Sequence, residues 1–143
     1  MKVSLSALPA FAKDFVAALP RVKGVHAHAV TLSGELGAGK TTFVQSVARE
    51  LGVNALVTSP TFILLQLYAI DRPPFKRLIH VDAYRLSPGE KDTIGWSEYG
   101  ADPENLILLE WPERLPGGAP RDARGLEFKV VDETTRDISE KKS

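Results

Sequence analysis

The apolar residues of this chain change periodicity several times, and each change predicts a different element. Near the N-terminus, helical spacing predicts a helix with Ser6 as its cap and Pro20 as its stop, built on Leu8, Phe11, Phe15, Val16 and Leu19. The apolar run 25–32 predicts a strand that leads directly into Gly34. Residues 40–51 predict a second helix that ends at Gly52, with an apolar face of Phe43, Val44, Val47, Ala48 and Leu51. The order is therefore strand, glycine-rich turn, helix.

Further apolar runs follow in the second half of the chain. Residues 62–68 (FILLQLY) predict a buried strand, which the segment Asp71-Arg72-Pro73-Pro74 breaks. Two more strands, 78–82 (LIHVD) and 106–110 (LILLE), each end in an acid. Between them, Ser87-Pro88-Gly89-Glu90 has the form of a capping box and predicts a short helix. Residues 126–130 alternate as in a half-exposed strand, and the polar tail from Ser139 is expected to fray.

This alternation of strands and helices predicts an α/β fold of the P-loop NTPase-like kind, with a mostly parallel central sheet flanked by helices. The chain has 143 residues, of which 43% are hydrophobic and 25% charged, values close to the average of globular domains. Neither an internal repeat nor a long linker divides it. We therefore expect one domain over residues 1–143.

Charge and cysteine content exclude several functional classes. Eighteen basic residues balance eighteen acidic ones, whereas a free-standing nucleic-acid binder usually has a basic excess. We therefore expect no direct DNA binding, and any link to RNA should run through a partner protein. The absence of cysteine excludes disulfides, thiolate metal sites and cysteine nucleophiles. Because no apolar stretch approaches the roughly 20 residues that span a bilayer, we expect a cytoplasmic protein without a membrane segment.

The segment from Gly34 to Thr41, GELGAGKT, satisfies the pattern G-x-x-x-x-G-K-[ST] throughout. Between a strand and a helix, this pattern is typical of a phosphate-binding loop, because glycines let successive N–H groups point at phosphate oxygens. Lys40 is expected to reach the β- and γ-phosphates, Thr41 to coordinate Mg²⁺, and Thr42 to contact the α-phosphate. The predicted nucleotide-binding residues are Gly37, Ala38, Gly39, Lys40, Thr41 and Thr42.

Such a loop needs carboxylates beside it to hold Mg²⁺ and to orient the attacking group. Asp82 and Glu110 both end apolar runs, and ligands bind at the carboxyl edge of parallel sheets. Glu110, which follows the more apolar run, is assigned to Mg²⁺ directly or through water. Asp82 is assigned to the nucleophilic water, with the exchange of the two roles left open. The alternative is that one acid caps a strand or pairs with a base such as Arg85.

Other polar residues admit both functional and structural interpretations. A hydroxyl within Thr58-Ser59-Pro60-Thr61 is placed to sense the γ-phosphate, although an ordinary turn explains the spacing equally well. His26 and His28 are expected to face solvent and not a metal, because no third ligand lies nearby. His80 is expected to be a hydrogen-bonded structural residue, and Trp111 either packs in the core or shapes the site. Nothing local assigns Arg121, Arg124 and Arg136 to nucleotide, partner or solvent.

The motifs GELGAGKTT, TSPTF, HVDAYRL, GWSEYG and LEWPE together resemble the TsaE family, in order and spacing, over about residues 5–138. The resemblance implies a small ATPase that acts with the TsaB–TsaD complex in making threonylcarbamoyladenosine in tRNA, meeting tRNA through that complex. It also implies ATP and Mg²⁺ at Lys40 and Thr41, Glu110 as the metal acid and Asp82 as an essential acid. Thr61 and Trp111 match positions of the family's site and switch. Ala83 departs from the usual leucine, and the segment 71–75 is longer than usual.

Three functions remain in competition at this stage. The leading one is an ATPase that is slow alone and stimulated by its partner complex. A small-molecule kinase of the nucleoside type would use the same loop, although 143 residues leave little room for a lid and an acceptor pocket. The third is an adaptor that binds ATP without meaningful hydrolysis. It would differ from the leading function only in the rate of ATP turnover.

Overall fold

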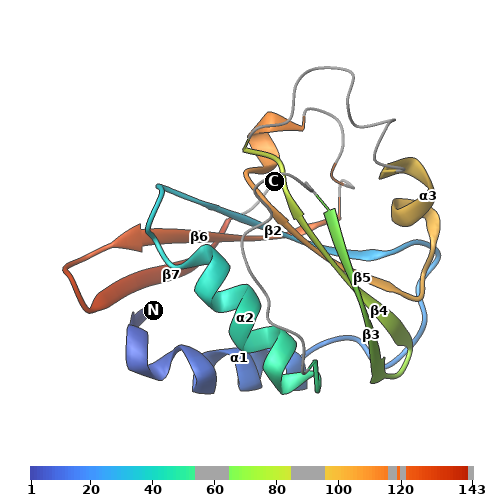
Figure 1. Cartoon of the computed structure of the whole chain (residues 1–143), viewed down its shortest axis with the longest axis horizontal. Helices are drawn as coiled ribbons and strands as arrows, with labels where there is room; N and C mark the ends of the chain where they lie inside the picture. The colour runs from blue at the N-terminus through green and yellow to red at the C-terminus, as the bar shows by residue number, and fades with distance from the viewer. Residues whose placement is uncertain (54–64, 85–95, 116–118, 120–121, 142–143) are drawn as a thin grey trace.

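The computed structural model describes residues 1–53, 65–84, 96–115, 119 and 122–141 (Figure 1). The elements in chain order are β1 (Lys2–Ser4), η1 (Leu5–Ala7), α1 (Leu8–Ala17), β2 (His28–Gly34), α2 (Lys40–Glu50), β3 (Leu65–Arg72), β4 (Phe75–Asp82), α3 (Trp96–Ala101), β5 (Asn105–Glu110), η3 (Pro112–Arg114), β6 (Arg124–Val130) and β7 (Thr135–Lys141). The strands form one seven-stranded sheet in the order β1-β7-β6-β2-β5-β4-β3. The predicted α/β fold is therefore confirmed.

The sheet is parallel at its centre and antiparallel at its edges. Strands β6, β2, β5 and β4 run parallel to one another, which is the arrangement expected from the sequence. The outer pairs β3–β4, β6–β7 and β1–β7 are antiparallel. Short connections explain the first two of these pairs, because a chain that turns back at Pro73-Pro74 or over residues 131–134 can only form a hairpin.

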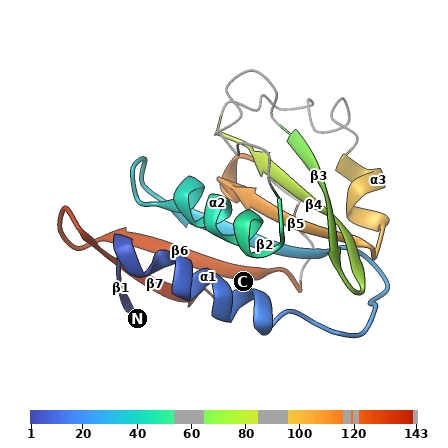
Figure 2. The same ribbon diagram turned by 60° about the horizontal axis from the view of Figure 1, so that its bottom comes forward.

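The helices divide between the two faces of the sheet (Figures 1 and 2). Alternate residues of the central strands, such as Val30 and Leu108, face α1 and α2 and form the larger core cluster. The residues between them, such as Ile107, belong to a second cluster with Trp96 of α3. Strand β5 is buried along its whole length, as its uninterrupted apolar sequence predicts for a central parallel strand.

The first two predicted helices are confirmed, with one correction at a cap. Helix α2 covers Lys40–Glu50, and Gly52 follows it with φ +83°, the left-handed conformation that favours glycine at a helix exit. Ser6 does not cap α1. It lies inside η1 with its Oγ 3.1 Å from the Ser4 Oγ, and the N-cap residue is Ala7, without a side-chain cap. A short 3-10 turn therefore precedes the helix, which begins just before Pro9.

Several strand boundaries differ from the prediction. Strand β3 is only partly buried and continues through Asp71 and Arg72, which belong to the strand and do not break it. Strands β4 and β6 begin earlier than predicted, at Phe75 and Arg124.

Strand β2 begins at His28 because residues 25–27 belong to the preceding loop, where Val25 is 90% exposed. The tail does not fray at Ser139: β7 continues to Lys141, and Ser139 pairs with Glu127 of β6. Ile138 is the buried apolar residue of β7, and the polar residues after it belong to the strand because their backbone pairs with β6. The segments 58–61 and 87–90 lie outside the described residues.

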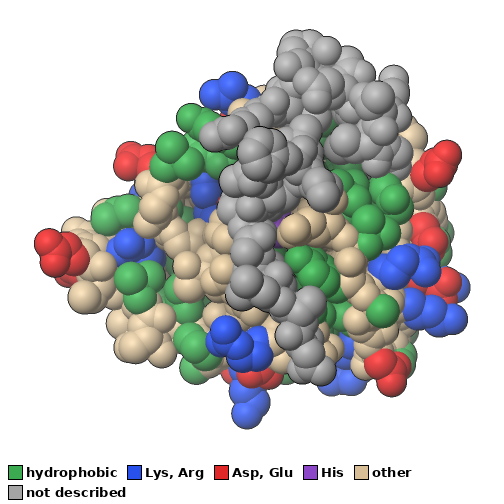
Figure 3. All heavy atoms as spheres, in the orientation of Figure 1, with side chains coloured by type: hydrophobic (Ala, Val, Ile, Leu, Met, Phe, Trp, Pro, Cys, Tyr) green, Lys and Arg blue, Asp and Glu red, His purple; other side chains and the backbone are tan. Residues whose placement is uncertain are grey.

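Charges of both signs are spread over the surface. On the face drawn in Figure 3, acidic and basic side chains lie interspersed around the periphery, in agreement with the balanced composition. Among the residues that the structure describes, no helix has the length and apolar character needed to span a membrane.

Gly34 joins β2 to the glycine-rich loop under a tight steric constraint. It pairs with Phe128 of β6 and adopts φ +144°, and a Cβ atom there would lie 2.4 Å from the Phe128 carbonyl oxygen. A real Cβ cannot occupy that space, so the strand or the loop would have to move.

The Gly34→Ala variant should therefore lose about 3 kcal/mol or more of unfolding free energy, from the clash and the strained φ combined. Gly52→Ala is the matched control, because Gly52 also has a positive φ but no atom near the position of a Cβ. It should cost only about 1 kcal/mol. Urea denaturation measures both, and equal losses in the two variants would show that the Phe128 contact is unimportant.

Candidate functional site

The predicted glycine-rich loop connects the carboxyl end of β2 to the first turn of α2. Gly37 and Gly39 adopt φ values of +80° and +96°, which residues with a Cβ adopt only at a cost. Within the loop, the Ala38 N–H donates to the Glu35 carbonyl over 3.1 Å. The first N–H groups of α2 have no carbonyl partner within the helix, so they are available to an anion at its positive end.

Lys40 is the buried cation of this loop. Its ammonium group donates to the Gly34 carbonyl and lies 3.6 Å from the centre of the Trp111 ring. Burial lowers the pKa of Lys40, while the negative charges of Glu110, Glu113 and Asp82 act in the opposite direction. An anionic ligand beside Lys40 would add to the second effect and favour the charged ammonium.

Glu110 is held between two side chains from different elements. The Thr41 hydroxyl, in the first turn of α2, lies 3.1 and 3.2 Å from the two carboxylate oxygens. The His80 Nε2 lies 2.5 Å from Oε2, and His80 is completely buried. The prediction that His80 is a hydrogen-bonded residue is therefore confirmed. Its Nδ1 has no hydrogen-bond partner within the described part of the chain.

Asp82 and Glu110 lie side by side because β4 and β5 are parallel and end at the same level. The two residues are direct partners in the strand register. One Asp82 carboxylate oxygen accepts the Tyr84 N–H over 3.0 Å, which turns the chain at the end of β4. The sequence-based expectation that both acids meet at the carboxyl edge of the sheet therefore agrees with the geometry.

These residues surround one cavity of about 300 Å³. Every residue predicted to bind nucleotide or metal lines this cavity, and so do Asp82 and Trp111. Thr61, the other residue predicted to belong to the site, lies outside the described residues. The cavity also has walls that the sequence did not assign, which are Leu5, Leu36 and Arg136. Leu5 and Arg136 come from opposite ends of the chain, so no local pattern could identify them.

Trp111 is fixed in an alternating stack of cations and rings. It adopts φ +60°, and its ring centre lies 4.8 Å from that of Tyr84, with the Lys40 ammonium over the Trp111 ring. The Arg114 guanidinium lies 5.3 Å from the Tyr84 ring centre. Cation–π attraction stabilises such an arrangement. Trp111 lines the cavity beside Lys40 and also packs against the second core cluster, so both interpretations left open by the sequence agree with the structure.

The oxygen-bearing side chains of the cavity fit a magnesium ion and a polyphosphate. The contact between Thr41 and Glu110 brings a hydroxyl and a carboxylate together, and Asp82 lies beside them. Mg²⁺ takes a few protein oxygens and completes its octahedron with water and phosphate. Among the described residues there is no cluster of three or more histidine, cysteine or acidic side chains, which would favour a permanently bound metal.

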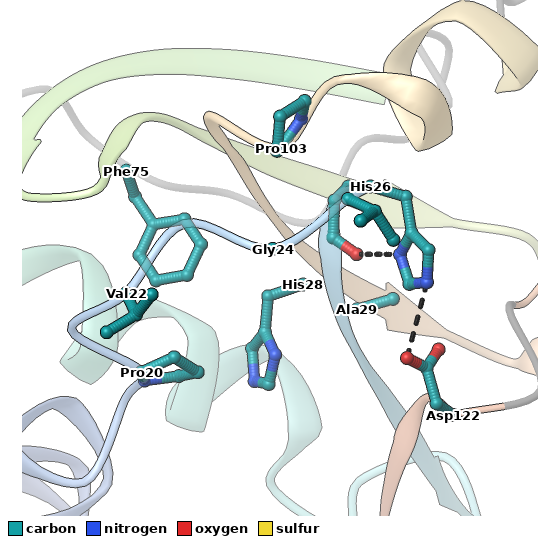
Figure 4. Close-up of a pocket in the computed structure, with 11 residues that line it drawn as sticks. Pro20, Val22, Gly24, His26, His28, Ala29, Phe75, Pro103 and Asp122 are labelled. Atoms are coloured by element: carbon teal, nitrogen blue, oxygen red, sulfur yellow. Dashed lines mark hydrogen bonds and ion pairs between the residues drawn. The ribbon is translucent and has the colours of Figure 1, made fainter.

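A second cavity of about 350 Å³ lies at the other end of β2 (Figure 4). Its wall contains His26, whose Nε2 lies 3.2 Å from an Asp122 carboxylate oxygen, and His28, which faces the Phe75 ring. Burial, together with the charge of Arg124, lowers the pKa of His28. The two histidines are therefore half-buried and do not simply face solvent as predicted. They form no metal cluster with other described residues.

A parallel sheet core, a glycine-rich loop and a following helix define an α/β protein with a P-loop NTPase-like fold. A family model described as "Threonylcarbamoyl adenosine biosynthesis protein TsaE" matches residues 3–138. The chain therefore belongs to the TsaE family.

Individual relatives agree with this assignment. The tRNA threonylcarbamoyladenosine biosynthesis protein TsaE of Borreliella burgdorferi is 36% identical over 123 residues, which cover 85% of this chain and 83% of that protein. The Bacillus subtilis protein of the same name is 34% identical, over 77% and 66% of the two chains. This chain spans only about half the length of other curated relatives. One of them is the Synechocystis protein of the same name, which is 41% identical over 61% of this chain and 55% of the Synechocystis protein.

A solved structure supports the fold independently. The crystal structure of YdiB from Bacillus subtilis superposes with a TM-score of 0.67 at 26% sequence identity. The match covers 96% of this chain and 82% of that one.

The stacking of Lys40 on Trp111 predicts a fluorescence signal. A polyphosphate bound at Lys40 should withdraw the ammonium from the ring and change the tryptophan emission. The chain has two tryptophans: Trp111 lines the cavity, whereas Trp96 is buried in the second core cluster and is not part of the cavity wall. A titration with Mg²⁺ and ATP should therefore change emission in wild type and Trp96→Phe but not in Trp111→Phe. A signal that persists in Trp111→Phe would contradict this geometry.

Proposed function

We propose that this protein binds and hydrolyses ATP with Mg²⁺ and thereby supports the TsaB–TsaD complex in forming threonylcarbamoyladenosine in tRNA. The observation that supports this most directly is the contact of the Thr41 hydroxyl with the Glu110 carboxylate at the head of a glycine loop. Such a pair supplies the oxygen ligands that a P-loop ATPase uses for its magnesium ion.

Phosphate binding follows from the loop and Lys40. The glycines at 37 and 39 turn the backbone so that N–H groups of the loop and of the first turn of α2 can reach phosphate oxygens. Lys40 would exchange its contact with the Gly34 carbonyl for the β- and γ-phosphates. Because a P-loop contacts the phosphates and not the base, the preference for adenine rests on the family resemblance.

Glu110 and Thr41 would hold Mg²⁺, which neutralises charge on the phosphate oxygens during the reaction. His80, in contact with the Glu110 carboxylate, would orient it, as partners of metal-binding carboxylates commonly do. Asp82, the neighbour of Glu110 in the sheet, would orient the attacking water and accept its proton. The water oxygen then bonds to the γ-phosphorus as the bond to the bridging oxygen breaks, releasing ADP and phosphate.

The link to tRNA rests on the family and on charge. The relatives named above are tRNA threonylcarbamoyladenosine biosynthesis proteins. This chain has no net charge, and charges of both signs are interspersed on the face in Figure 3, so a protein complex is the more plausible carrier of the RNA.

The first test is steady-state ATP hydrolysis with and without the TsaB–TsaD complex. Wild type should be slow alone and clearly stimulated by the complex. Lys40→Ala, Asp82→Asn and Glu110→Gln should each lose about 100-fold or more in kcat, because each removes a charge from the reacting groups. Glu98→Gln is the control, since it removes an exposed acid from α3 on the opposite face of the sheet.

The same assay separates the competing functions. Hydrolysis stimulated by a nucleoside, with no effect of the complex, would replace the proposal with a small-molecule kinase. If a non-hydrolysable ATP analogue supports threonylcarbamoyladenosine formation over repeated turnovers as well as ATP does, the protein is an adaptor. Loss of activity in Glu98→Gln as well would show that the three losses are not specific to the site.

Magnesium dependence tests Thr41 separately. Mg²⁺ should tighten the binding of a non-hydrolysable ATP analogue to wild type, as measured by calorimetry with and without EDTA. Thr41→Val should remove most of this magnesium-dependent gain and leave metal-free binding almost unchanged, because it removes one metal ligand and keeps the side-chain volume. Thr41→Ser, which retains the hydroxyl, should restore the gain. An unchanged magnesium effect in Thr41→Val would exclude the hydroxyl as a ligand.

A further inference from the structure

Arg136 is a buried arginine in the wall of the glycine-loop cavity. It comes from β7, near the C-terminus, and is 8% exposed. Its Nη1 donates to the carbonyls of Asp132 and Thr135, over 2.7 and 3.1 Å, inside the turn that joins β6 to β7. Its Nη2 donates to the Gly37 carbonyl over 3.2 Å. One guanidinium group therefore ties the hairpin to the loop.

The contact with Gly37 fixes the peptide unit at the centre of the loop. In a trans peptide, the carbonyl of Gly37 and the N–H of Ala38 point in opposite directions. Arg136 holds the carbonyl, and the Glu35 carbonyl accepts the N–H. Gly37, on one side of this unit, has no Cβ to restrict the rotation of the unit. Without Arg136, the Gly37 carbonyl would lose this hydrogen bond, and the bond from the Ala38 N–H to the Glu35 carbonyl would still oppose the rotation.

The charge of Arg136 has no ion-pair partner among the residues that the structure describes. Among the ion pairs of the described residues, none includes Arg136, and its three acceptors are neutral carbonyls. Its Nε is buried and has no hydrogen-bond partner in the described part of the chain. The three carbonyls offset part of the cost of burying this charge, and an anion nearby would offset more of it. The cavity that Arg136 lines is the one in which the phosphates are proposed to bind.

We propose that Arg136 is a positioning residue that holds the glycine loop in its anion-binding shape and favours the polyphosphate through its charge. This proposal rests on the proposed nucleotide binding. It makes the affinity for nucleotide depend on the β6–β7 hairpin, which lies far from the loop in the sequence. The effect falls on binding more than on turnover, because Arg136 contacts the loop backbone and not the proposed magnesium ligands.

The decisive experiment compares Arg136→Gln, Arg136→Lys and wild type, with Arg124→Gln as the matched control. Arg124 lies on the same hairpin, but its guanidinium pairs with Glu140 and is absent from the wall of the cavity. Three quantities are measured well below the melting temperature of each variant. These are the Kd for a fluorescent ATP analogue with Mg²⁺, the KM and kcat for ATP, and the hydrogen exchange rate of the Ala38 amide without nucleotide.

Arg136→Gln should raise Kd and KM by about tenfold or more, the effect of losing a hydrogen bond to a charged group, and change kcat much less. Its Ala38 amide should exchange faster. Arg136→Lys should recover part of the affinity, because an ammonium keeps the charge but cannot span the three carbonyls. Arg124→Gln should match wild type in all three quantities.

Unchanged Kd and unchanged Ala38 exchange in both Arg136 variants would overturn the proposal. A fall in kcat with normal Kd would also overturn it, because it would assign Arg136 to the chemical step. If wild type itself binds no nucleotide, the proposed function fails, while faster Ala38 exchange in the variants would still support the positioning of the loop. If Arg136→Gln does not fold, the Arg136→Lys values decide between these outcomes.

Discussion

The parallel register of β2, β5 and β4 is the constraint on which the rest of the site depends. In this register Leu32 lies opposite Glu110, and Glu110 lies opposite Asp82. The three strands therefore reach the same edge of the sheet together, and the chain leaves β2 into the glycine loop at the level of both acids. A shift of one residue would turn a carboxylate to the other face of the sheet. The core packing of both faces, which fixes the register, is therefore also what aligns the site.

Burial of Glu110 illustrates how stability and function compete at this edge. A carboxylate without partners in the core would be strongly unfavourable. Here His80 and Thr41 satisfy it from two neighbouring elements, although the Nδ1 atom of the buried His80 has no partner among the described residues. Three apolar side chains of similar volume in place of Glu110, His80 and Thr41 would avoid the cost of burying polar groups. The chemistry proposed for Glu110 therefore explains why Glu110, His80 and Thr41 occupy these positions instead of apolar residues.

The two ends of the chain meet beside the glycine loop. Strand β1 pairs with β7, and side chains from η1, α1 and β7 surround Gly39: Leu5, Leu8 and Arg136. Leu5, near the N-terminus, and Arg136, near the C-terminus, therefore both form part of the cavity wall. The family match, which extends over residues 3–138, includes Leu5, Leu8 and Arg136. Strand β7 and the glycine loop are therefore in direct contact, although Arg136 lies 99 positions from Gly37 in the sequence.

The local features of this protein follow from patterns in its sequence. Spacing predicted α1, α2 and the central strands, and the glycine-loop pattern together with two strand-end acids predicted the composition of the site. Only the tertiary structure decided that Ser139 belongs to a strand, that His80 and Thr41 share Glu110, and that Arg136 reaches Gly37. The physical reason is that periodicity and motifs record interactions between residues close in the chain. Strand pairing at an edge and contacts across 99 positions depend on how separate elements pack, which no local pattern encodes.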